Sequence, residues 1–108
     1  TMIRPLIAAL LISACAPAFA AQNPGELCRS IHDGAKAIME GRQSHYPMPD
    51  MIKAIPEEVE GPVSVYFMAM IFEAYDEPAK MSDIRRAERA NQFANEQYMK
   101  CIKNGGVL

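Results

Sequence analysis

The pattern of apolar and polar residues divides the chain after residue 20 into helical segments separated by prolines. The first segment has Asn23 as a helix N-cap, Pro24 at the first helical position and Glu26 in the first turn, as in a capping box. Its apolar residues recur at spacings of three and four and define one face: Leu27, Cys28, Ile31, Ala35, Ile38 and Met39. We therefore predict an amphipathic helix that runs to about Gln43 and carries Cys28 on its buried face.

Two shorter segments follow. A proline opens and another proline ends a predicted short helix over Pro49–Ile55, and residues 56–61 form an acidic connector. The segment Pro62–Tyr75 is apolar on nearly all sides, which predicts an element buried at the centre of the domain. Its length and its methionine and alanine content favour a helix over a strand.

The last segment predicts a helix from Ser82, a suitable N-cap, to about Lys103, with Asn104 and Gly105 as its stop. We expect its buried face to consist of Ile84, Ala87, Asn91, Ala94, Tyr98 and Cys101. The predicted fold class is therefore all-α, a small bundle of three to four helices.

The N-terminal residues 1–20 have the pattern of a cleavable signal peptide. Arg4 precedes an apolar run, Leu6–Ile12, and Pro17 precedes the small residues Ala18 and Ala20. The apolar run is shorter than the roughly 20 residues that span a bilayer, so no transmembrane helix is expected after cleavage. Residues 12–15 also fit a lipobox, and its use would give a lipid anchor at Cys15. We expect a helical domain at 21–108 that is periplasmic or secreted.

Only two cysteines, Cys28 and Cys101, follow the predicted cleavage site. Both lie on predicted buried faces, and an oxidising compartment favours their pairing, so we expect one disulfide that closes the bundle. The formal net charge of the chain is −2 and its basic residues form no stripe, which argues against nucleic acid as a partner.

Several short motifs occur in a characteristic order: Ala37-Ile38-Met39 followed by Arg42-Gln43, Pro47-Met48 with Met51-Ile52, Glu73-Ala74-Tyr75 with Pro78, and Phe93-x-Asn95-x-x-Tyr98-x-x-Cys101. Together with the signal peptide and Cys28, this order resembles a family of short uncharacterised exported proteins, often encoded by phages and prophages of Gram-negative bacteria. Relatives tend to have small residues such as Gly-Val where this chain has His45-Tyr46. The resemblance implies a helical exported domain with a cysteine pair, and no established activity.

Two metal sites are conceivable from residue spacing. His45, Met48 and Met51 offer imidazole and thioether groups of the kind that bind Cu(I), although both methionines are also suited to packing. Cys28 and His32 lie one helical turn apart, as zinc ligands do, but a disulfide would consume the thiolate. We expect no cofactor.

Catalytic patterns are sparse. The chain has no Gly-x-Ser-x-Gly motif, and the carboxylate pairs Asp76-Glu77 and Glu57-Glu58 lie beside prolines, where solvated helix ends are expected. We expect a solvated basic face at Arg85, Arg86 and Arg89. Five further polar residues lie on or beside the apolar stripes: Arg42, Gln43, Tyr75, Asn95 and Tyr98. Such residues form either an interaction patch on the surface or a network of hydrogen bonds in the core.

These observations favour a non-enzymatic periplasmic module that binds and modulates a protein of the cell envelope. By analogy with small phage-encoded proteins, exclusion of a second phage or inhibition of a muralytic enzyme would be suitable tasks. The alternative hypothesis is a periplasmic copper-handling protein that uses His45, Met48 and Met51.

Overall fold

The computed structural model describes residues 23–80 and 82–106, and all secondary structure within them is helical. The helices are α2 (Pro24–Gln43), α3 (Met48–Lys53), α4 (Gly61–Tyr75) and α5 (Asp83–Lys103). This arrangement confirms the predicted all-α fold of three to four helices. The predicted signal peptide at 1–20, including Cys15, lies outside the described residues. Within the described ranges, no helix combines the length and the hydropathy needed to cross a membrane.

Local interactions account for the N-termini of helices α2 and α5, which the sequence predicts most precisely. The Asn23 side chain accepts a hydrogen bond of 2.9 Å from the backbone N–H of Glu26, and Ser82 Oγ accepts one of 3.2 Å from Arg85. Each cap satisfies a backbone donor that has no partner within its own helix. The short helix α3 begins and ends slightly earlier than the predicted Pro49–Ile55.

The long helices α2 and α5 end in the same backbone motif. After α2, His45 has a φ of 62°, and the N–H of Tyr46 donates to Gly41 O at 2.8 Å. After α5, Gly105 has a φ of 68°, and the N–H of Gly106 donates to Cys101 O at 2.9 Å. This is the Schellman arrangement, in which glycine usually occupies the left-handed position because it has no Cβ.

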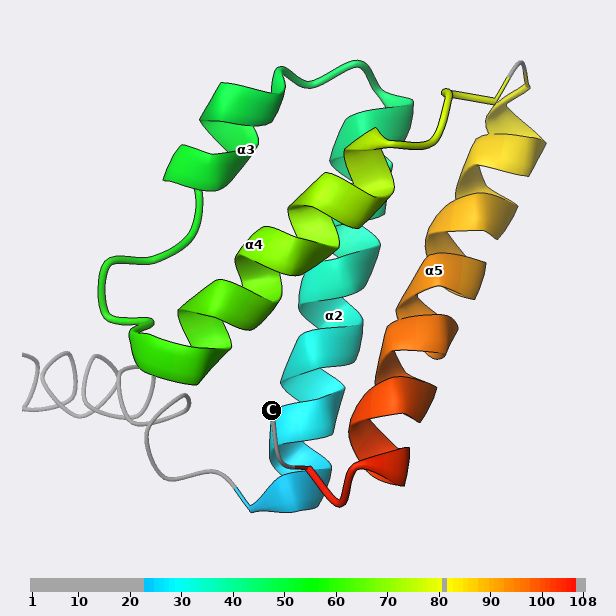
Figure 1. The fold of residues 1–108 in the computed structure, drawn as a ribbon. Coiled ribbons are helices and arrows are strands. Elements are labelled where there is room, and N and C mark those ends of the chain that lie inside the picture. The colour runs from blue at the N-terminus through cyan, green and yellow to red at the C-terminus, as the bar shows by residue number, and fades with distance from the viewer. Residues whose placement is uncertain (1–22, 81, 107–108) are drawn as a thin grey trace, which may run out of the picture.

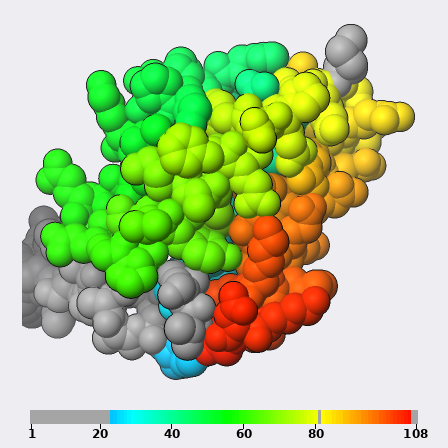
Figure 2. All heavy atoms as spheres, viewed as in Figure 1, coloured from blue at the N-terminus to red at the C-terminus, as the bar shows by residue number. Residues whose placement is uncertain are grey.

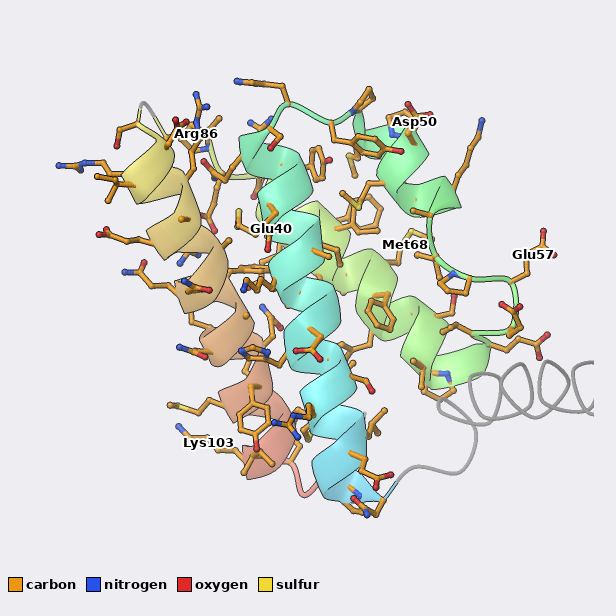
Figure 3. The ribbon with its side chains drawn as sticks, turned by 180° about the vertical axis from the view of Figure 1, so that it is seen from behind. Glu40, Asp50, Glu57, Met68, Arg86 and Lys103 are labelled. Carbon is orange, nitrogen blue, oxygen red and sulfur yellow. A yellow bond between two sulfur atoms is a disulfide. The ribbon has the colours of Figure 1, made fainter. Side chains whose placement is uncertain are left out.

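The amphipathic helix α2 lies at the centre of the fold and contacts each of the other three helices. Figure 1 shows α5 running antiparallel beside α2, with α4 crossing α2 obliquely and α3 next to α4. Figure 2 shows the side of α2 that the other helices cover, and Figure 3 shows from behind that no helix covers its opposite side. The core therefore forms along one side of α2, the helix that contacts the other three, and the prediction that the most apolar segment, now α4, would be the central element was wrong.

The exposed residues of α4 show why overall hydropathy misleads here. Phe67, Met70, Ile71 and Ala74 are buried, but Val65 is 69% exposed and Phe72 is 54% exposed. Helix α4 is covered by α2 and in part by α3, so the side of α4 that carries Val65 and Phe72 faces solvent. An apolar composition describes what a helix could bury, whereas its neighbours decide what it does bury.

The buried face of α5 differs from the predicted one. Ala94 and Cys101 are buried as expected, but the remaining buried residues are Ala90, Phe93 and Gln97. The other predicted members of this face are exposed: Ile84, Ala87, Asn91 and Tyr98. The buried face of α5 is rotated about the helix axis relative to the predicted face. Gln97 is hydrogen-bonded to side chains of α4, so α5 faces α4 as well as α2.

Candidate functional site

Cys28 and Cys101 form the predicted disulfide, with a Cα–Cα distance of 5.4 Å. The bond joins the first turns of α2 to the last turns of α5, and both residues are fully buried. Because both sulfurs are consumed, the zinc interpretation of Cys28 and His32 is excluded in this oxidised form. Among the described residues, no group of three or more His, Cys, Asp or Glu side chains is placed to hold a metal ion.

Gln43, one of the five predicted polar residues, is buried at the end of α2. Its side-chain oxygen accepts a hydrogen bond of 2.6 Å from the backbone N–H of Lys80, and its Nε2 lies 3.4 Å from Met39 Sδ. Gln43 thus holds the segment between α4 and α5 against α2, because a buried backbone N–H needs a partner.

Arg42 and Tyr75 lie near Gln43, at the same end of the bundle. Arg42 Nε donates to Glu77 O at 2.7 Å, and its guanidinium lies 5.5 Å from the centre of the Tyr75 ring. The Tyr75 hydroxyl donates to Tyr46 O at 2.6 Å, which ties α4 to the loop after α2. Burial raises the pKa of Tyr75 above its ordinary value, although the positive charge of Arg42 opposes this shift.

Asn95 and Tyr98 lie elsewhere, on the side of α5 that faces the first turns of α2. Together with Gly25, Arg29 and His32 they line an open hollow of about 490 Å³. The ring of Tyr98 meets that of His32 edge to face at 6.0 Å. The five predicted polar residues therefore fall into two separate groups. Arg42, Gln43 and Tyr75 lie at one end of the bundle, and Asn95 and Tyr98 lie in the hollow beside the first turns of α2.

The predicted solvated basic face was wrong for Arg86 and Arg89. Arg89 forms two hydrogen bonds of 2.6 Å to the Glu77 carboxylate and one of 2.7 Å to Glu96, and Arg86 Nε donates to Lys80 O at 2.8 Å. These bonds from Arg89 hold the pKa of Glu77 below its usual range. The two arginines are therefore part of the packing between α5 and the segment before it.

Between α4 and α5, Gln97 contacts two side chains of α4 in a polar network that the sequence did not indicate. Gln97 Nε2 donates to Glu73 at 3.0 Å, the Tyr66 hydroxyl lies 3.5 Å from Gln97 Oε1, and Lys100 pairs with Glu73 at 3.1 Å. Gln97 is almost fully buried, so its amide sets the register of α5 against α4. Its helical spacing from Cys101 and Phe93 was the signal that could have placed it on the buried face.

The three residues of the copper hypothesis have different environments. His45 is exposed in the loop after α2, whereas Met48 and Met51 are partly buried and pack against the core. The Met51 methyl group lies over Gly41, where a Cβ would overlap it. Packing accounts for both methionines, and copper binding stays a prediction that Cu(I) titration of a Met48→Leu, Met51→Leu variant would test.

An apolar cleft with a volume of about 430 Å³ lies between α2, α3 and α4. We call it the α2–α3–α4 cleft. Its lining includes the small residues Gly34 and Ala37 of α2 and Ala54 at the end of α3, and α4 contributes Phe67 and Ile71. Its lining is complete with Ser30, Asp33, Gly34, Ala37, Ile38, Met51, Ala54, Ile55 and Pro56. This cleft could not be predicted from the sequence, because its lining residues come from three separated segments.

Gly34 is required for the close contact between α2 and α4 at this cleft. A Cβ at residue 34 would overlap the ring of Phe67. Asp33, beside it, is the one charged residue of the lining, and its carboxylate lies 2.9 Å from Nδ1 of His32. The cleft thus combines an apolar interior with an exposed carboxylate at its edge.

Comparisons of this chain with models of known protein families, with curated proteins and with solved structures give no match. The resemblance to exported phage-linked proteins stays a prediction. The structure shows a small all-helical protein whose first and last described helices are joined by the disulfide Cys28–Cys101.

Proposed function

We propose that this protein is a non-enzymatic, extracytoplasmic module that binds a protein of the cell envelope in the α2–α3–α4 cleft. The observation that carries the proposal is the cleft itself: an open, mostly apolar depression on a small domain. Contiguous apolar surface on a small protein is characteristic of binding sites. The volume of about 430 Å³ lies within the range of roughly 300–1,000 Å³ that is typical of ligand pockets.

The chemistry of the lining supports binding over catalysis. Ser30 and Asp33 are its only polar side chains, and both come from α2. An acyl-transfer or acid–base site needs a nucleophile or base, a group that orients it and donors for the developing charge. An apolar depression with a single carboxylate at its edge supplies anchoring surface instead.

The disulfide supports an oxidising compartment as the place of action. Such bonds form and persist outside the cytoplasm, and small exported domains use them where a core alone is too small. The expected signal peptide agrees with this location. Modulation of an envelope enzyme or complex, including the exclusion or inhibition tasks of phage-encoded proteins, is the form of activity we propose.

Site-specific photo-crosslinking in a Gram-negative host tests the proposal. The exposed residue Ala54 of the cleft wall is replaced by p-benzoylphenylalanine, and exposed Gln92 of α5 serves as the control position. We expect a defined adduct from position 54 and none from position 92. The identified partner is then purified and its affinity for the wild-type protein is measured by calorimetry.

A matched pair of variants makes this test decisive. Ala37 and Ala87 are both exposed helical alanines, but only Ala37 lines the cleft. Ala37→Arg should weaken the purified complex at least tenfold because the long side chain occupies the cleft, whereas Ala87→Arg should leave the affinity unchanged. Equal adducts from both crosslinking positions, or full affinity in Ala37→Arg, would contradict docking in the cleft.

A further inference from the structure

We infer that a second copy of this chain docks on the side of α2 and α5 that faces away from α4, antiparallel to the first copy and related to it by a twofold axis. We call this surface the α2–α5 face and define it by Lys36 and Glu40 of α2 and Ile84, Asn91 and Tyr98 of α5. It shares no lining residue with the α2–α3–α4 cleft, so the inference is independent of the proposed function.

A row of exposed side chains runs along α5 on this face. Ile84, Asn91 and Tyr98 follow one another at intervals of seven residues, which places them within about 40° of one another around the helix. Ile84 is 73% exposed and Tyr98 is 39% exposed, although the sequence pattern predicts both to be buried. A seven-residue repeat of this kind, with an asparagine at one position, is typical of a helix that packs against another helix.

The α2–α5 face has no cover among the described helices. Figure 3, the view from behind, shows α2 and α5 side by side with no other helix in front of them and with Glu40 on α2. Lys36, Glu40 and Asn91 line one open hollow of about 340 Å³ between the two helices. Within the described ranges, Lys36 and Glu40 form no ion pair and the Asn91 side chain forms no hydrogen bond, so all three are available to another molecule.

The charged residues of this face are placed symmetrically about one level of the bundle. Helices α2 and α5 are antiparallel, and the disulfide joins Cys28 to Cys101. Ten residues along each helix from this bond, Asn91 of α5 therefore lies level with residue 38 of α2. Lys36 and Glu40 lie two residues before and two residues after that level. A twofold axis that crosses the helices at this level thus brings Lys36 opposite Glu40 of the second copy, and Glu40 opposite Lys36 of the second copy.

The row on α5 is symmetric about the same level. Ile84 precedes Asn91 by seven residues and Tyr98 follows it by seven, so the axis brings Ile84 opposite Tyr98 of the second copy. The two Asn91 side chains meet on the axis, where an amide can donate to its copy and accept from it. A parallel arrangement would instead place Lys36 against Lys36 and Glu40 against Glu40, and like charges across an interface are unfavourable. The charges and the apolar pairs therefore favour the same antiparallel arrangement.

The area of the α2–α5 face is sufficient for a weak specific dimer. Ile102, which is 45% exposed, continues the row on α5, so the face extends over about 27 Å from Ile84. Two packed helices are about 20 Å wide, so each copy would bury about 500 Å². A total of about 1,000 Å² lies at the low end of the range for specific interfaces, and we expect a reversible dimer with micromolar affinity.

Exchange of the two charges tests the antiparallel pairing. The association of the purified oxidised protein is measured by sedimentation velocity over a wide range of concentrations, where we expect a monomer–dimer equilibrium. Lys36→Glu alone, or Glu40→Lys alone, places like charges opposite each other and should weaken the dimer at least tenfold. The double variant Lys36→Glu, Glu40→Lys restores opposite charges and should recover most of the wild-type affinity. Both residues are exposed, so the urea midpoint of each variant should stay close to that of the wild type.

A matched pair of variants tests the position of the axis. Asn91→Asp places two carboxylates next to each other on the axis and should weaken the dimer at least tenfold. Gln92→Asp makes the same change in net charge at the next exposed residue of α5, about 100° away around the helix, and should change the affinity by less than twofold. Ala37→Arg, which fills the α2–α3–α4 cleft, should also leave the dimer unchanged.

The outcomes identify what covers the α2–α5 face. A wild-type protein that stays monomeric at every concentration overturns the inference. A dimer that persists in Asn91→Asp, or that is lost in Ala37→Arg, uses another surface and also overturns it. If the double charge variant stays as weak as the single variants, the antiparallel pairing is wrong. Photo-crosslinking from p-benzoylphenylalanine at position 91 in a Gram-negative host should give an adduct of two copies of this chain, and an adduct with a different protein instead overturns the inference.

Discussion

Reduction of the Cys28–Cys101 bond should remove a large part of the stability of this domain. The two cysteines are 73 residues apart, so the bond closes almost the whole described chain into one loop. In the chain-entropy model, a loop of this length lowers the entropy of the unfolded state by an amount worth about 4 kcal/mol at 25 °C. Small domains are stable by only about 5–15 kcal/mol in total, so the reduced protein should be close to unfolding.

Urea denaturation followed by circular dichroism measures this effect directly. Because both cysteines are fully buried, the protein is unfolded in the presence of reductant and then refolded before the titration. With an m value of about 1 kcal/mol/M for a domain of this size, the midpoint should fall by about 4 M urea. The control is Cys28→Ala, Cys101→Ala, whose midpoint should be low and should not respond to reductant.

A midpoint that falls by less than about 1 M on reduction would refute this reasoning. It would mean that packing between α2 and α5 alone holds the two ends together. The same would follow if the double alanine variant matched the oxidised wild-type protein.

Three further changes test individual contacts by urea denaturation. Gly34→Ala should lower the free energy of unfolding by about 1–3 kcal/mol, despite the higher helix propensity of alanine, because its Cβ overlaps the Phe67 ring. His45→Gly should raise it by about 1 kcal/mol, because His45 has a left-handed φ of 62°. Glu77→Gln should lower it by about 1 kcal/mol at pH 7 through loss of the ion pair with Arg89. Since the pKa of Glu77 is lowered in the fold, this contribution is complete above the ordinary carboxyl pKa and is lost as the pH falls through the lowered pKa, so the difference between the two proteins should shrink progressively in acid.

Each change has a control in the same chain. Gly25→Ala should not destabilise, because its Cβ would lie at an ordinary 3.5 Å from Asn23 Oδ1, and a loss equal to that of Gly34→Ala would contradict the steric argument. Gly105→Ala should destabilise, because Gly105 occupies the left-handed position after α5. Glu57→Gln should leave the free energy of unfolding at pH 7 unchanged, and a loss equal to that of Glu77→Gln would contradict a specific role for Glu77.

Much of the secondary structure follows from the sequence alone, since helix ends depend on interactions within a few residues. The caps at Asn23 and Ser82 involve hydrogen bonds to the residue three positions later. Pro24 opens α2 for the same local reason, and Gly105 ends α5. The cysteine pair was also predictable, because only two cysteines follow the expected leader and both lie on apolar stripes.

The candidate site could not be predicted in the same way, because it depends on which helices become neighbours. Arg89 was expected in solvent, yet it pairs with Glu77 across the turn before α5. Gln97 faces inward because α4 supplies Glu73 and Tyr66 as partners over separations of 24 and 31 residues. Such pairings arise only when packing sets the rotation of each helix about its axis.

The α2–α3–α4 cleft also depends on tertiary packing and not on local sequence signals. Ile38, Phe67 and Ile71 of its lining were expected in the core and are buried, but the small residues Gly34, Ala37 and Ala54 carry no sequence signal for a cleft. The cleft exists because α3 and α4 pack against α2 without filling the space between the three helices. The sequence pattern specifies the apolar face of each helix, but not how closely those faces pack. The sequence thus determined the helices and the cysteine pair, whereas the tertiary structure decided which helix is central, which faces are buried and where the apolar cleft lies.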